Sequence, residues 1–125
     1  MGAIITDGAG RLLLIQRGHA PEEGRWSLPG GRVRPGESDA EAVAREVCEE
    51  TGLHVEPGAL VGAVERPAPG GAVYDIHDYA ASVTGGRLAA GDDAADARWI
   101  DPGDIDQLPL TSGLAETLTS WGVLG

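Results

Sequence analysis

Residues 31–53 constrain this chain more than any other segment, because they join a glycine-containing loop to a helix rich in carboxylates. Ser38 followed by Glu41 is the pattern of a capping box, which predicts a helix that begins just after Ser38. Gly52 is a typical C-terminal stop. The apolar positions repeat with helical spacing and predict the packed face, which comprises Ala40, Val43, Ala44, Val47 and Thr51 with Cys48 at its margin.

The same helix carries three glutamates on one face. Glu46, Glu49 and Glu50 fall at i, i+3 and i+4. Like charges at this spacing destabilise an isolated helix by about 0.2–0.5 kcal/mol per pair, so we expect a cation to lie on them. Carboxylate oxygens suit Mg²⁺ or Mn²⁺, the ions that accompany phosphate chemistry. The pattern therefore predicts metal-assisted hydrolysis.

Length and charge limit the other functions. The 125 residues fit one domain, which we predict to span residues 1–125. The formal net charge is -11 and all nine basic residues are arginines, which argues against non-specific binding of nucleic acid. No apolar run approaches the ~20 residues of a membrane span. The single cysteine, Cys48, cannot form an internal disulfide; we expect an inert thiol beside the packed face and a cytoplasmic protein.

The rest of the chain alternates strand and turn signals. A turn at residues 7–10 between the apolar runs 4–6 and 12–15 predicts a hairpin near the N-terminus. Strands are predicted over residues 60–64, 73–83 and 97–100. Short helices are predicted after residue 101 and over residues 114–121.

The spacing of Gly31, Glu37, Arg45-Glu46, Glu49-Glu50 and Gly52 resembles the signature of the Nudix hydrolases at every defined position. The resemblance implies an α/β fold, an α/β/α sandwich with a mixed β-sheet between helices. It also implies that water attacks a phosphorus of a nucleoside diphosphate linked to another moiety, with one to three Mg²⁺ or Mn²⁺ ions bound.

The resemblance assigns roles to individual residues. Glu46, Glu49, Glu50 and the backbone carbonyl of Gly30 are expected to hold the metal, and Arg45 to orient these carboxylates. A further acid is expected six residues before the tryptophan of a late strand. That position is Asp93, before Trp99, with Asp92 and Asp96 as nearby competitors. The general base is left open among Glu46, Glu50 and Asp93.

Five residues are candidate substrate contacts. Arg17 ends an apolar run and could pair with a phosphate. Trp26 could stack on a base, with core packing as the alternative. Glu37 could serve the metal's outer shell or tie the loop to the helix. His77 and Tyr79 alternate onto one strand face that could line the cleft.

The substrate is predicted by a weaker marker. In the family, members that cleave ADP-ribose tend to carry a proline about sixteen residues beyond the signature, and Pro69 stands sixteen after Leu53. We therefore expect ADP-ribose or a related nucleotide sugar. An oxidised nucleoside triphosphate is the alternative substrate, and a non-catalytic nucleotide-binding regulator is the alternative of another class. The resemblance leaves a homodimer and a monomer open.

Overall fold

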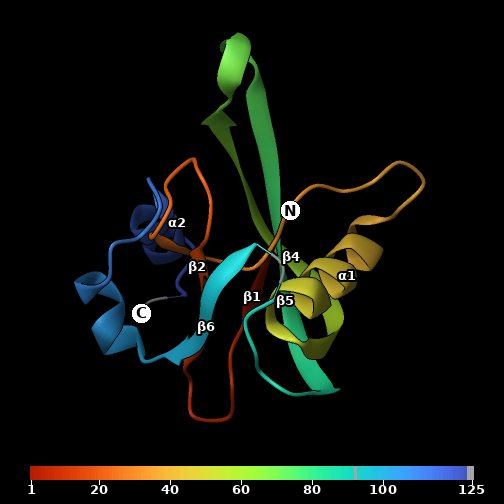
Figure 1. Cartoon of the computed structure of the whole chain (residues 1–125), viewed down its shortest axis with the longest axis vertical. Helices are drawn as coiled ribbons and strands as arrows, with labels where there is room; N and C mark the ends of the chain where they lie inside the picture. The colour runs from red at the N-terminus through yellow and green to blue at the C-terminus, as the bar shows by residue number, and fades with distance from the viewer. Residues whose placement is uncertain (92, 124–125) are drawn as a thin grey trace.

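The computed structural model describes residues 1–91 and 93–123. Strands and helices follow one another along the chain in an α/β order (Figure 1). They are β1 (Gly2–Ile5), β2 (Leu12–Arg17), β3 (Trp26–Ser27), α1 (Asp39–Thr51), β4 (Leu53–Pro67), η1 (Pro69–Gly71), β5 (Val73–Gly86), β6 (Ala94–Ile100), η2 (Pro102–Gln107) and α2 (Leu114–Ser120).

The strands form two small sheets. One is mixed, in the order β1-β5-β4, with β1 parallel to β5 and β4 antiparallel to it. The other is antiparallel, in the order β3-β2-β6. The end of the β4–β5 hairpin around η1 projects from the rest of the molecule as an arm (Figure 1).

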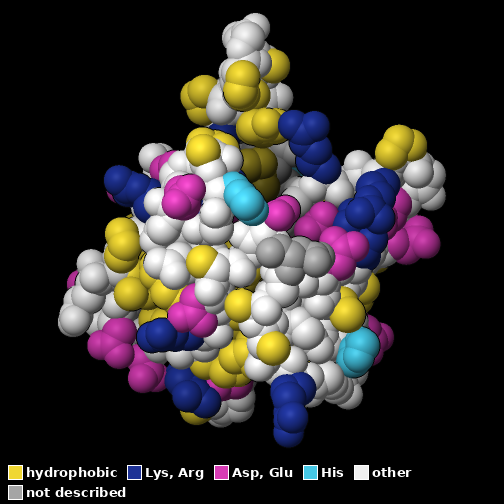
Figure 2. Space-filling view, in the orientation of Figure 1, with side chains coloured by type: hydrophobic (Ala, Val, Ile, Leu, Met, Phe, Trp, Pro, Cys, Tyr) yellow, Lys and Arg dark blue, Asp and Glu magenta, His cyan; other side chains and the backbone are white. Residues whose placement is uncertain are grey.

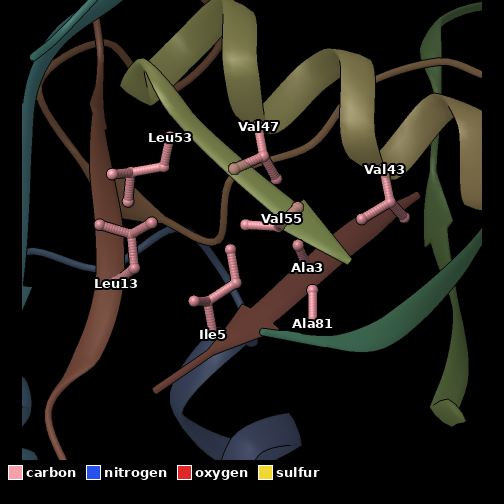
Figure 3. Close-up of a cluster of buried hydrophobic side chains, with 8 residues drawn as sticks. All are labelled: Ala3, Ile5, Leu13, Val43, Val47, Leu53, Val55 and Ala81. Atoms are coloured by element: carbon pink, nitrogen blue, oxygen red, sulfur yellow. The ribbon is translucent and has the colours of Figure 1, made fainter. Parts of the chain in front are cut away.

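Alternating side chains divide the interior into two cores. Ile5 and Leu13 point into the first core, where they meet Val43 and Val47 of α1 (Figure 3). Their neighbours Ile4, Leu12 and Leu14 point into the second core, against Leu114 and Leu118 of α2. Because successive residues of a strand point to opposite faces, the apolar run of each strand contributes side chains to both cores. The predicted α/β sandwich with helices on both sides is confirmed, but its strands form two sheets.

The caps of α1 are those that the sequence predicts. The hydroxyl of Ser38 accepts a hydrogen bond from the amide of Glu41 at 3.1 Å, and Glu41 accepts one from the amide of Ser38 at 2.9 Å. Gly52 closes the helix with a left-handed φ of 74°.

The packed face of α1 differs in part from the prediction. Val43, Val47 and Thr51 are buried as expected, but Ala42 is buried instead of Ala40, which is exposed. Cys48 is also exposed, so the prediction that this thiol lies beside the packed face is wrong. The sheet covers a slightly rotated face of the helix, one that includes Glu50.

The predicted N-terminal hairpin is wrong. Its turn does close, since the amide of Gly10 donates to the carbonyl of Asp7 at 3.1 Å. Beyond a single bridge between Thr6 and Leu12, however, the two strands separate. β1 pairs with β5, whereas β2 runs between β3 and β6. Both faces of β2 are buried, so this strand needs neighbours on both edges within the interior.

The later elements follow the prediction with longer bounds. The strands predicted at 60–64, 73–83 and 97–100 lie within β4, β5 and β6, and β4 begins directly after Gly52. Two turns of 3₁₀ helix (η2) and the short helix α2 follow where helices are expected. Within residues 1–91 and 93–123, no helix is long and apolar enough to cross a membrane.

Candidate functional site

One cleft brings together the acidic face of α1 and the loops around it. It has a volume of about 650 Å³. In Figure 2, acidic side chains with arginines beside them gather over α1, below the β4–β5 arm. The cleft is lined by Ile15, Arg17, Gly18, His19, Ala20, Gly30, Gly31, Arg34, Glu46, Glu49, Glu50 and Asp93. All of the expected metal ligands and Asp93 are in this lining.

Glu50 is the most buried of these carboxylates, with 9% of its surface exposed. One of its oxygens accepts a hydrogen bond from the amide of Gly30 at 2.7 Å. Burial raises the pKa of Glu50 to about 8, and the nearby Glu46 and Asp93 carboxylates act in the same direction. A cation bound beside Glu50 would favour the ionised carboxylate and offset the cost of burying it.

Arg45 ties the glutamates of α1 to the preceding loop. Its guanidinium donates to both oxygens of Glu37, at 2.7 and 2.9 Å, and to Glu46 at 2.8 Å. It also reaches Glu49, four residues on, at 3.3 Å. The cation expected from the crowding of the glutamates is thus supplied in part by the chain itself. Arg45 contacts two glutamates while it fastens the loop to the helix.

Glu37 belongs to this internal network. Hydrogen bonds from Arg45 and from the amide of Arg34 lower the pKa of Glu37 to about 2. The Glu37 carboxylate therefore stays ionised throughout the neutral range. Of the two roles considered for this residue, its contacts agree with tying the loop to the helix.

Gly31 allows the loop to lie directly against the acidic face. A Cβ atom at this position would lie 2.7 Å from the carboxylate of Glu46, which is closer than real Cβ atoms approach other heavy atoms. Gly36 differs, because its φ of 80° lies in the left-handed region and nothing surrounds it. Gly31 is thus needed for space at the site, and Gly36 for the turn.

The donor set fits a hard divalent cation in its chemistry. Three glutamates and a loop carbonyl are oxygen ligands of the kind that Mg²⁺ and Mn²⁺ bind. Within the described part of the chain, however, no three acidic or histidine side chains converge closely enough to hold an ion as they stand. Arg45 draws Glu46 and Glu49 towards itself, so these side chains must rotate to share an ion.

The expected substrate contacts fall in different places. Arg17 lines the cleft, and its Nε donates to the carbonyl of Pro21 at 2.6 Å. Trp26 is buried in the second core. His77 and Tyr79 lie outside the cleft lining and contact Asp39 in the first turn of α1. Of Arg17, Trp26, His77 and Tyr79, the structure brings only Arg17 to the cleft.

The acids near Asp93 lie in different surroundings. Asp96 lies on β6, where its carboxylate accepts from Arg98 at 2.7 Å and from the amide of Ala97. Asp92 lies outside the described residues. Asp93 itself lines the cleft.

Sequence reasoning missed two basic side chains in the lining. Arg34 comes from the glycine-containing loop, and one of its nitrogens lies 3.7 Å from a Glu49 oxygen. His19 comes from the loop after β2 and faces Asp93. Both lie in loops, where no helical or strand periodicity indicates which side chains share a face. The sequence could have indicated His19 only by its closeness to Arg17, and Arg34 only by its place within the signature.

A smaller apolar hollow lies beside segment 27–31, which also reaches the acidic cleft. It has a volume of about 140 Å³ and contains the buried carboxylate of Asp78. Burial raises the pKa of Asp78. Ser27 and Leu28 line this hollow, and Gly30 and Gly31 of the same segment line the acidic cleft.

Known proteins are similar to this chain in sequence. An ADP-ribose pyrophosphatase from Methanocaldococcus jannaschii is 40% identical over an alignment of 112 residues that covers 85% of this chain and 66% of the relative. An 8-oxo-(d)GTP phosphatase from Mycolicibacterium smegmatis is 38% identical over an alignment of 92 residues that covers 72% of this chain and 28% of the relative. The chain thus spans less than two thirds of the length of each.

The fold is similar to solved structures as well. A MutT NUDIX hydrolase from Burkholderia pseudomallei superposes with a TM-score of 0.76 at 30% sequence identity, covering 94% of this chain and 92% of that one. The model of the NUDIX domain matches residues 1–121, almost the whole chain. The chain therefore belongs to the NUDIX domain family.

Proposed function

We propose that this chain hydrolyses a phosphoanhydride bond of a small nucleotide with the help of one to three divalent cations, Mg²⁺ or Mn²⁺. The observation that carries the proposal is a single cleft lined by Glu46, Glu49 and Glu50 together with Arg17 and Asp93. Carboxylates that hold cations and a guanidinium that binds phosphate oxygens are the groups that phosphoryl transfer requires.

Glu46, Glu49, Glu50 and the carbonyl of Gly30 are the proposed metal ligands. When bound, the cation supplies neutralising charge at the phosphate oxygens and makes water a stronger nucleophile near neutral pH. The chain's own part is to position the ligands. Arg45 holds Glu46 and Glu49, and the amide of Gly30 holds Glu50. Arg17 is the proposed phosphate contact.

Asp93 is the proposed general base. Glu46 already accepts a hydrogen bond from Arg45, and Glu50 already accepts one from Gly30. The Asp93 side chain is 86% exposed and lines the same cleft. It can therefore take a proton from an attacking water without breaking the network that holds the ligands.

The nucleoside is proposed to occupy the smaller hollow. Its lining is mainly apolar, and the buried Asp78 and Arg66 add two groups that can bond to the edge of a base. Segment 27–31 lines both this hollow and the acidic cleft.

ADP-ribose or a related nucleotide sugar is the proposed substrate. The relative from Methanocaldococcus jannaschii supports it, as does Pro69, which begins η1 at the tip of the arm. An oxidised nucleoside triphosphate is the second candidate, supported by the relative named as an 8-oxo-(d)GTP phosphatase. A homodimer remains a prediction that the mass of the protein in solution tests.

The deciding experiment is product analysis over a nucleotide panel with Mg²⁺ or Mn²⁺. We expect ADP-ribose to yield AMP and ribose 5-phosphate, with no turnover in excess chelator. Release of pyrophosphate from 8-oxo-dGTP, with ADP-ribose intact, would favour the second candidate instead. Tight binding without cleavage of any compound would favour a regulator.

A variant pair tests the site itself. Glu50→Gln removes a proposed ligand and should lower kcat by a factor of about 10² or more, because an open metal site is worth several kcal/mol. Glu56→Gln, an exposed change on β4, is the matched control. Equal activity of the two variants would contradict the proposed site.

A further inference from the structure

Two loops meet at the edge of the acidic cleft, one following β2 and the other preceding β6. The amide of Gly18 donates to the carbonyl of Asp93 at 2.9 Å. A Cβ atom on Gly18 would lie 2.5 Å from that same carbonyl oxygen, so the two main chains are in direct contact. The relative position of residues 18 and 93 is therefore set by the backbone.

This contact brings two functional groups together. His19 follows Gly18, and its Nε2 atom lies 3.2 Å from an Asp93 carboxylate oxygen. Both side chains line the cleft that contains the glutamates of α1. The other two histidines lie elsewhere. His54 is exposed on β4, and His77 of β5 lies beside Asp39 of α1.

The pair is largely exposed, with 68% of the His19 side chain and 86% of the Asp93 side chain accessible. Even a fully charged exposed ion pair contributes only about 0–1 kcal/mol to folding, so stability is a poor reason for this contact. The contact has a different effect on the direction in which the Asp93 carboxylate points. A carboxylate on an exposed loop turns freely unless a neighbour restrains it, and proton transfer needs a defined direction.

We propose that His19 is a positioning residue for the reaction: its imidazole restrains the Asp93 carboxylate so that it faces the water that attacks the phosphorus. The inference rests on the proposed function, in which Asp93 is the general base. His19 acts through Asp93 and need not touch the substrate.

Three variants test this role. His19→Phe keeps a ring but loses the nitrogen, and should lower kcat about fivefold, the upper value of an exposed ion pair, with KM unchanged. His19→Gln places an amide nitrogen near the former Nε2 and should recover most of the loss. His54→Phe is the matched control and should keep full activity.

A double-variant cycle with Asp93→Asn separates the proposals. If His19 acts through Asp93, His19→Phe has no further effect once Asp93 is replaced. Equal additional loss in that background, or a change confined to KM, would overturn the inference. If Glu50→Gln is inactive while His19→Phe and Asp93→Asn keep full kcat, the inference fails and the proposed metal site stands. Full activity of Glu50→Gln would instead refute the proposed function.

Discussion

Replacement of Gly31 by alanine is the sharpest test of how the loop meets the acidic face. The new Cβ would lie 2.7 Å from the Glu46 carboxylate, whereas ordinary contact begins at 3.4 Å. Glu46 must therefore move by about 0.7 Å, which is 3.4 Å minus 2.7 Å. Misplacement of a catalytic group by about 1 Å costs on the order of 10²-fold in rate, so we expect kcat to fall by roughly 10- to 100-fold.

Stability should change much less than activity in this variant. The obstructing atoms belong to the end of a flexible side chain, so the core needs no rearrangement. We expect the free energy of unfolding, measured in urea, to fall by less than about 2 kcal/mol. The assay compares kcat, on whichever nucleotide the panel identifies, with that of Gly103→Ala.

Gly103 is the matched control because nothing lies within 4 Å of a Cβ added there and its φ is not in the left-handed region. The control should keep wild-type kcat. Full activity of Gly31→Ala would refute the idea that Glu46 needs the space that Gly31 leaves at the site. Unfolding of Gly31→Ala would show instead that the loop cannot shift.

Three further changes test the helix cap, the Arg45 network and the buried carboxyl of Asp78. Ser38→Ala removes half of the capping box and should destabilise the protein by about 1 kcal/mol in urea unfolding, with kcat nearly unchanged; no loss of stability would contradict the role of the cap. Arg45→Met frees Glu46 and Glu49 and should lower kcat more than tenfold, because the guanidinium that fastens them and the loop is lost; an unchanged kcat would show that the glutamates need no guanidinium. Asp78→Asn should stabilise the fold at neutral pH, because burial raises the pKa of Asp78 in the folded chain and its charged form is therefore disfavoured there. That stabilising effect should be absent below the pKa of Asp78 in the unfolded chain, about 4, and should grow as the pH rises from there through the higher pKa of the folded chain. Urea unfolding at pH 4 and at pH 7 checks this. A larger stabilising effect at pH 4 than at pH 7 would contradict it.

The helix of the site could be predicted almost to the residue, and the strand pairing could not. The capping box and Gly52 act over three or four residues, so the local sequence contains everything that sets the ends of α1. The partner of β1 is β5, more than seventy residues away. No local pattern in residues 2–5 indicates that β5 is the partner. The turn at Asp7–Gly10 instead suggested pairing with the strand that follows it.

The residues of the site also divide into those that local sequence predicts and those that depend on long-range contacts. The glutamates were found because helical spacing puts them on one face whatever the rest of the fold does. Strand alternation put His77 and Tyr79 on a common face but could not say that the first turn of α1 covers it. His19 was missed because it reaches the cleft only through a contact between two loops.

The position of Arg45 has a consequence for how the protein would bind the proposed cation. One guanidinium touches Glu37, Glu46 and Glu49, so their repulsion is relieved before any dissolved ion arrives. We therefore expect α1 to form without the proposed divalent cation. In the proposed function, the cation is then free to arrive together with the nucleotide instead of being part of the fold.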